Sequence, residues 1–219
     1  MNAPPENASL PSTVPGGPRT KLLLATRNAK KLLELQRIMD KALGPHAIEL
    51  VGLSDVPDYP EAPETGLTFG ENALLKAREG VRYTGLPTVA DDSGLAVDAL
   101  SGMPGVFSAR WSGRHGDDKA NLDLVLAQIG DVPDDHRGAA FVCAAALVLP
   151  GGKEHLVEGR QVGRLLRAPR GEGGFGYDPI FLAEGQTRTN AELSAEEKDA
   201  ISHRGKAFRA LAKVIAKTV

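Results

Sequence analysis

Several kinds of residue are scarce in this chain of 219 residues. It has one cysteine and one tryptophan, and aromatic residues make up only 5% of it. A lone cysteine cannot build a disulfide framework, which favours a reducing compartment such as the cytoplasm. Because Cys143 stands in an apolar run, we expect a buried, inert thiol. The net charge of −2 gives no general attraction to nucleic acid, so no nucleic-acid partner is expected.

Long apolar runs are missing as well. The run over residues 139–149 stops at Pro150-Gly151-Gly152, short of the roughly 18 residues that suggest a membrane span. Residues 1–20 hold five prolines and a Gly-Gly pair, without the basic start and apolar segment of a secretory signal. We expect a disordered tail over 1–20, one folded domain over 21–219, and no membrane association.

Strands and helices alternate in the first half of the sequence, whereas strands pair in the second half. The periodicity predicts strands over 21–26, 48–51, 141–149 and 155–164, another strand ending at Asp91, helices over 28–43, 68–83 and 118–129, and a last helix from Ser194 that bends at 202–205. This order favours a mixed α/β sheet flanked by helices.

The pair Asp91-Asp92 lies between an apolar run and Ser93-Gly94. Successive strand residues point to opposite faces, so we expect the strand to end here if both carboxylates serve one site. Mg²⁺ takes one or two carboxylates and keeps waters and phosphates as its other ligands. The pattern indicates a magnesium site, to which Glu64 is a second candidate ligand. The alternative is a turn capped by its own Asp side chain.

Residues 26–31, Thr-Arg-Asn-Ala-Lys-Lys, connect the first predicted strand to a helix. The free N–H groups and the dipole of a helix N-terminus attract anions. Thr26 and Asn28 can add hydrogen bonds and Lys31 a positive charge, so this junction is a candidate phosphate site, although it is not a Walker loop. The alternative is that Asn28 only caps the helix and that the lysines form a solvated face.

The segment 171–179 combines four glycines with Phe175, Tyr177 and Asp178. Glycines let the backbone approach a ligand closely, and aromatic rings stack on flat bases whose edges an acid can read. This segment is therefore a candidate base-binding loop. The alternative is a hairpin loop whose aromatic rings pack in the core.

Three cationic or titratable side chains lie near the C-terminus. They are Lys198, His203 and Arg204, on or beside the helix that Ser194 and the acidic residues after it predict. Their spacing brings them towards one side, where they could donate to the same ligand. The alternative for each of them is a solvated helix face.

Together these segments resemble the noncanonical purine nucleoside triphosphate pyrophosphatases, the inosine/xanthosine triphosphatases that convert dITP, ITP and XTP to monophosphates. The motifs that carry this resemblance span residues 22 to about 208 and occur in the family's order. They are Ala25-Thr26-x-Asn28-x-x-Lys31, Glu64-Thr65-Gly66-x-Thr68-Phe69-x-Glu71-Asn72-Ala73, Ala90-Asp91-Asp92-Ser93-Gly94-Leu95, Pro104-Gly105-Val106-Phe107-Ser108-Ala109-Arg110, Gly174-Phe175-Gly176-Tyr177-Asp178-Pro179 and Ser202-His203-Arg204-Gly205.

The resemblance implies an elongated, two-lobed α/β fold with the active site in a central cleft, a homodimer, and a requirement for Mg²⁺. It implies that Asp92 is the proton acceptor and a metal ligand, with Glu64 as a further ligand. Arg27 departs from the family, because many members carry glycine there. The substrate-binding residues that the resemblance implies are Thr26, Arg27, Asn28, Ala29, Lys30, Lys31, Ser93, Phe175, Gly176, Tyr177, Asp178, Lys198, His203 and Arg204.

The expected function is Mg²⁺-dependent hydrolysis of dITP, ITP and XTP to the monophosphate and pyrophosphate, which removes these nucleotides from the pool. Two alternatives stay open. One is a related pyrophosphatase that acts on pyrimidine or modified nucleotides. The other is a nucleotide-binding module without turnover, against which the retention of Asp91, Asp92 and Glu64 argues.

Overall fold

The computed structural model describes residues 20–26, 29–44, 48–60 and 63–218. The expected tail therefore lies outside the described residues except for Thr20, and so do Arg27 and Asn28. Ala29 and Lys30 begin a helix, but their side chains are not described.

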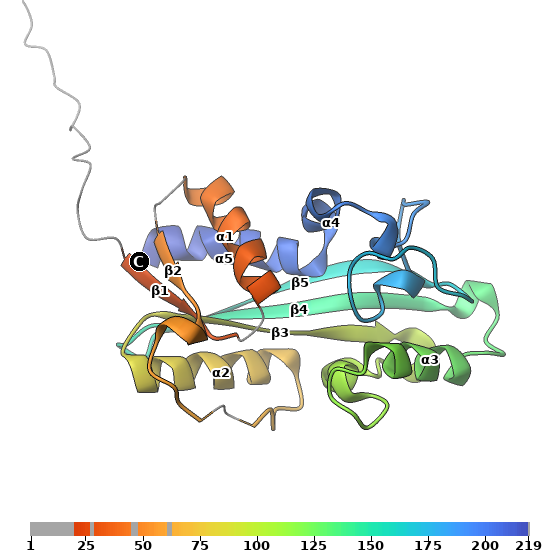
Figure 1. Ribbon diagram of the computed structural model, residues 1–219, viewed down its shortest axis with the longest axis horizontal. Coiled ribbons are helices and arrows are strands. Elements are labelled where there is room, and N and C mark those ends of the chain that lie inside the picture. Colours follow the sequence, from red (N-terminus) through yellow and green to blue (C-terminus); the bar gives the residue numbers. More distant parts are fainter. Residues whose placement is uncertain (1–19, 27–28, 45–47, 61–62, 219) are drawn as a thin grey trace, which may run out of the picture.

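One six-stranded sheet runs along the length of the molecule (Figure 1). Its strands follow the spatial order β2 (Ile48–Val51), β1 (Thr20–Leu24), β3 (Thr88–Val97), β4 (Gly138–Val148), β5 (Glu154–Leu165) and β6 (Phe181–Ala183). β1 pairs in parallel with β2 and β3, whereas the pairs from β3 to β6 are antiparallel. The expected mixed sheet and the β4–β5 hairpin are confirmed.

Helices cover both faces of the sheet. α1 (Ala29–Leu43), α4 (Ala195–Ile201) and α5 (His203–Thr218) lie on one face, and α2 (Phe69–Thr84) and α3 (Asp118–Gln128) follow one another along the other (Figure 1). α4 and α5 meet at Ser202, where the sequence predicts a bend. Within the described residues, no helix has the length and apolar character needed to cross a membrane.

The apolar core is divided, and the division falls at the centre of β3. One cluster joins Val89 to α1 and α5, and a second joins Leu95 to α3 and β6. A third, rich in alanine, packs α2 against Ala90 and the same face of β4. The polar residues from Asp91 to Ser93 therefore lie between the cores of the two ends of the molecule, where a cleft between lobes is expected.

The prediction that the strand ends at Asp91 is wrong. β3 continues to Val97, and Asp91 and Asp92 pair with Ala145 and Ala144 of β4. The long antiparallel partner supplies backbone hydrogen bonds past the Ser93-Gly94 pair, so local turn signals are overridden. Gly94 instead permits a close approach, because a Cβ there would lie 2.4 Å from the Gly105 carbonyl oxygen.

Two other sequence features have structural roles. Glu71 closes a capping box at the start of α2, where its Oε2 accepts hydrogen bonds from the N–H groups of Leu67 (2.7 Å) and Thr68 (3.0 Å). Cys143 is fully buried in β4, and burial raises the pKa of its thiol to about 12. The expectation of an inert thiol is confirmed.

Candidate active site

The two central carboxylates serve opposite faces of the sheet. Because β3 continues through them, Asp91 points towards α1 and α5, whereas Asp92 points towards α2. The expectation that both belong to one site at a strand end is therefore wrong. Each carboxylate has its own set of partners.

Asp91 lies between two cations. Lys31 Nζ, on α1, is 3.1 Å and 3.0 Å from its two oxygens, and Arg204 Nε, on α5, is 3.5 Å from Oδ2. Ser93 Oγ donates to the same Oδ2 at 3.0 Å. Burial alone would raise the pKa of Asp91, but the charges of Lys31, Arg204 and Lys76 outweigh it and hold the pKa well below its usual range. Asp91 is therefore ionised at neutral pH.

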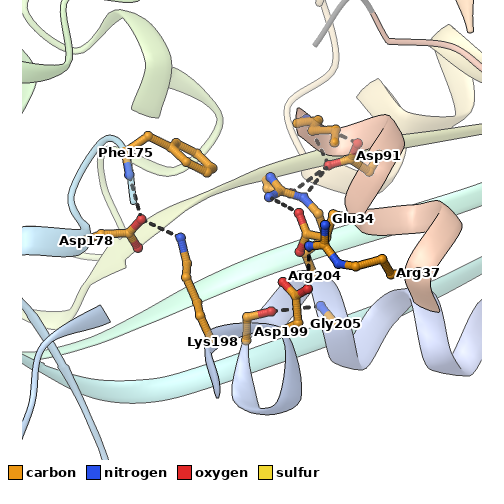
Figure 2. Close-up of polar contacts among 12 residues, drawn as sticks. Glu34, Arg37, Asp91, Phe175, Asp178, Lys198, Asp199, Arg204 and Gly205 are labelled. Carbon is orange, nitrogen blue, oxygen red and sulfur yellow. Dashed lines mark hydrogen bonds and ion pairs between the residues drawn. The ribbon is translucent and has the colours of Figure 1, made fainter. Parts of the chain in front are cut away.

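Arg204 connects this cluster to a residue that the sequence does not single out. Its Nη1 donates to Glu34 Oε2 at 3.1 Å, so the buried guanidinium lies between Glu34 and Asp91 (Figure 2). Glu34 follows Lys31 by three residues and shares its helix face. That spacing is the signal that could have identified it.

Asp92 lies in a different environment, on the α2 side. Asn72 Nδ2 donates to its Oδ2 at 3.1 Å, and Lys76 Nζ is 3.2 Å from its Oδ1. Burial raises the pKa of Asp92, Lys76 lowers it, Glu64 raises it, and the pKa ends above its usual value. Asn72 and Lys76 are four residues apart on α2 and so face the same carboxylate. In the sequence, Asn72 is part of a motif without a separate role, and Lys76 belongs to no motif.

Glu64 and Asp92 converge on one point. Lys76 Nζ lies 2.9 Å from Glu64 Oε1 as well as 3.2 Å from Asp92 Oδ1, and Arg110 Nη1 is 3.2 Å from Glu64 Oε2. Burial raises the pKa of Glu64, but Lys76 and Arg110 bring it below its usual value. The two carboxylates of the predicted metal site are thus brought together around a cation.

The donor set suits Mg²⁺ on chemical grounds. Among the described residues, no group of three or more His, Cys, Asp or Glu side chains could hold a metal ion. Mg²⁺ needs fewer protein ligands than this, because it keeps several waters and binds substrate phosphates through its remaining positions. Two carboxylates that already converge on a positive charge fit such a site.

A cavity of about 110 Å³ lies next to the cluster around Asp91, because Ser93 and Arg204, which both contact Asp91, are part of its lining. Its walls include Ser93, the loop residues 175–178 and the three predicted cations or donors Lys198, His203 and Arg204. These residues come from four separate parts of the sequence. The structure therefore brings the predicted base-binding residues together.

Cations and an aromatic ring form one wall of this cavity. Lys198 Nζ lies 4.6 Å from the centroid of the Phe175 ring, and Arg204 Cζ lies 5.7 Å from it. Lys198 Nζ also binds Asp178 Oδ2 at 2.5 Å (Figure 2). Phe175 remains 44% exposed, so its ring is available to a flat ligand.

Two neighbouring rings have other roles. Tyr177 packs into the core near α3 and its hydroxyl donates to the Ser108 carbonyl oxygen at 2.8 Å, so it anchors the loop and does not offer a free face. The buried His203 ring stacks on Phe141 with centroids 4.9 Å apart. Burial, with the charges of Arg204 and Lys198, holds the pKa of His203 well below its ordinary value, so the ring is neutral at pH 7.

Arg204 joins the two ends of the site. It lines the cavity with Phe175 and Lys198, and it also contacts Asp91 beside Lys31. Of the predicted phosphate segment 26–31, Thr26 follows β1, and Lys31 lies in the first turn of α1. The cavity and the Lys31–Asp91 pair are therefore neighbours, joined by Arg204.

A cavity with an aromatic wall, a lysine at the start of a helix and a separate acidic pair are the features expected of an α/β enzyme that acts on nucleotides. The chain belongs to the Ham1 family, whose pattern it matches over residues 22–214. The resemblance seen in the motifs is therefore confirmed.

Individual relatives agree with this assignment. The chain is 64% identical to the dITP/XTP pyrophosphatase of Streptomyces coelicolor over 196 residues, which cover 90% of this chain and 97% of that protein. It is 62% identical to the crystal structure of a nucleoside-triphosphatase / dITP/XTP pyrophosphatase from Mycobacterium abscessus, with a TM-score of 0.74 over 88% of this chain and 98% of that one. The HAM1 protein from Coxiella burnetii is 40% identical with a TM-score of 0.81, covering 91% of this chain and 100% of that one.

Proposed function

We propose that this protein hydrolyses the noncanonical purine nucleotides dITP, ITP and XTP to monophosphates and pyrophosphate, with Mg²⁺ as cofactor. The observation that carries the proposal is the position of Arg204, which connects an aromatic base pocket to the Lys31–Asp91 pair. The relatives named dITP/XTP pyrophosphatase support the same substrates. Removal of these nucleotides from the pool is the corresponding cellular role.

The pocket favours a 6-oxo purine over adenine. Phe175 is partly exposed to stack on a base, and Lys198 and Arg204 place donors over its ring. A 6-oxo group accepts hydrogen bonds from such donors, whereas the 6-amino group of adenine would leave them unpaired. Sites that depend on hydrogen bonds of this kind can discriminate by about 10⁴ or more.

The phosphates would lie beside Lys31 and the start of α1. Lys31 would stabilise negative charge there, while Asp91 holds its ammonium in place. Among the described residues β1 pairs with β3 only as far as Val89, so a triphosphate at the start of α1 would lie at the edge of β3 beside Asp91 and Asp92, within reach of both faces of the sheet. Asp92, on the α2 face, would take a proton from the attacking water. Mg²⁺ held by Glu64 and Asp92 would neutralise charge on the triphosphate.

We also propose that the enzyme is a cytoplasmic homodimer with no nucleic-acid or membrane partner. The family resemblance supports the dimer, and the single buried cysteine suits a reducing compartment. Sedimentation equilibrium of the purified protein tests the dimer. A monomeric mass at the concentrations used for assay would contradict it.

Pyrophosphate release tests the activity. The purified protein would be assayed with Mg²⁺ against ITP, dITP, XTP, ATP, GTP, dTTP and UTP, and again after chelation of the metal. We expect rapid release from the first three substrates and none without Mg²⁺. A preference for pyrimidines would indicate the related pyrophosphatases, and no release from any substrate would indicate a binding module.

A further inference from the structure

A buried pair of amides lies next to the base pocket without lining it. Gln161, on β5, and Asn190, at the start of a short 3-10 helix over Asn190–Glu192, exchange two hydrogen bonds of 3.0 Å. Both residues are at most 2% exposed. A further hydrogen bond of 3.3 Å runs from Asn190 Nδ2 to Asp178 Oδ1.

The pair has only one consistent orientation. A carboxylate can only accept, so Asn190 must turn its NH₂ group towards Asp178. Asn190 Oδ1 then accepts from Gln161 Nε2, and Gln161 Oε1 accepts the second N–H of Asn190. A flip of Asn190 alone would break both bonds to Gln161, and a flip of both amides would place an oxygen against the carboxylate, so Gln161 and Asp178 together fix the orientation of Asn190.

The bond from Asn190 completes the coordination of Asp178. Its other oxygen, Oδ2, accepts from the Phe175 N–H at 2.8 Å and from Lys198 Nζ at 2.5 Å. The side chain of Asp178 is 3% exposed, so loss of the bond to Oδ1 would leave a buried acceptor unpaired. The carboxylate would then be held through Oδ2 alone, and the position of Lys198, which binds that oxygen, would be less tightly fixed.

The segment around Asn190 also holds the loop backbone. Thr189 Oγ1 donates to the Arg170 carbonyl oxygen at 2.8 Å, and the Gly173 N–H donates to the Ala191 carbonyl oxygen at 3.0 Å. Gly173 is required at this contact, because a Cβ would lie 2.8 Å from that oxygen. Three consecutive residues thus support the base loop, and Asn190 is the one that reaches its carboxylate.

We propose that Asn190, held by Gln161, is a positioning residue for base selection. It fixes Asp178 so that Lys198 presents its ammonium group at the Phe175 ring, where a 6-oxo purine would accept from it. The inference rests on the proposed function and adds a determinant that does not touch the substrate. Selection of 6-oxo over 6-amino bases then depends on an amide pair outside the pocket.

The variant Asn190→Leu tests this proposal. We expect KM for ITP to rise about tenfold, the effect of weakening the charged hydrogen bond from Lys198 to the base, with little change in kcat, because Lys31 and Asp92 are untouched. ATP lacks the 6-oxo acceptor, so its kcat/KM should hardly change. The ratio of kcat/KM for ITP to that for ATP should therefore fall about tenfold.

A purely structural role predicts a different pattern. Asn190→Leu leaves the buried Gln161 amide without its partner and lowers the melting temperature, whereas the double variant Gln161→Leu/Asn190→Leu removes both amides and should recover the part of the stability that the Gln161 amide costs. Selectivity should stay low in the double variant, since Asp178 still lacks its donor. Recovery of selectivity together with stability would overturn the proposal.

A control and a second readout separate this inference from the activity itself. Gln36→Leu removes another amide–carboxylate bond, to Asp40 on α1 (2.8 Å), and should leave the ratio unchanged. Calorimetric binding of IMP and AMP gives the same ratio without turnover. Absence of pyrophosphate release by the wild type would refute the proposed function, whereas an unchanged IMP/AMP ratio in Asn190→Leu would refute the role of Asn190.

Discussion

Asp91 and Asp92 are adjacent, buried residues on opposite faces of β3, and their pKa values are shifted in opposite directions. On the α1/α5 face, two direct cationic partners keep Asp91 ionised and its pKa low. On the α2 face, one cation is shared with Glu64, and the pKa of Asp92 is raised. Strand alternation thus separates Asp91, whose charge orders the cations beside it, from Asp92, which binds a proton more readily than an ordinary aspartate.

The largest effect should follow removal of the Asp92 carboxylate. Asp92→Asn keeps the shape of the side chain, but the amide cannot accept the proton of the attacking water. We expect kcat for ITP to fall about 10³-fold, within the range for loss of a general base. Circular dichroism would establish that the fold is retained, and a folded variant with wild-type kcat would contradict the assignment.

Removal of the Asp91 charge should affect stability and binding more than chemistry. Asp91→Asn leaves Lys31 and the buried Arg204 without their common anion, although Arg204 keeps Glu34. We expect unfolding free energy to fall by about 3 kcal/mol, as for other broken buried ion pairs. Urea unfolding measures this. A stability equal to the wild type would show that Glu34 alone balances the cations.

The phosphate end can be tested through the lysine that Asp91 holds. Lys31→Ala should lower kcat/KM for ITP by about 10- to 100-fold, because a charge-assisted contact to phosphate is lost. Lys21→Ala is the matched control, since Lys21 is exposed and pairs with Glu49 at 3.4 Å on the sheet. An equal loss in both variants would point to general electrostatics and away from a phosphate site at Lys31.

The sequence predicts most of the elements but not the continuation of β3 that places Asp91 and Asp92 on opposite faces. Local signals were sufficient for α4, where Ser194 caps the helix, and for the β4–β5 hairpin at residues 150–152. The end of β3 was misjudged because the hydrogen bonds that sustain it come from β4, far along the chain. A short stretch of sequence does not show how far a strand extends when its partner strand lies far along the chain.

The candidate site shows the same division. The position of Glu64 just before a helix, together with the family resemblance, predicts that it reaches the same metal as Asp92, and in the structure the two carboxylates converge on Lys76. Lys76 was missed, since a lysine in an amphipathic helix is typical of a solvated surface. Only the packing of α2 on β3 shows that it lies between the two carboxylates.

The smallest effect concerns stability against pH. The folded pKa of Asp92 is raised, so above it the folded state carries a charge that the unfolded state holds more easily, and stability falls as pH rises through that window. The folded pKa of Asp91 is lowered, so its contribution is complete above the unfolded pKa of about 4 and is lost only as pH falls below it. Asp92→Asn should therefore melt slightly above the wild type at pH 7 and match it in acid, whereas Asp91→Asn should melt below it until strongly acidic pH. Melting curves from pH 3 to 8 measure both, and a common pH dependence for the two variants would mean that the faces do not differ.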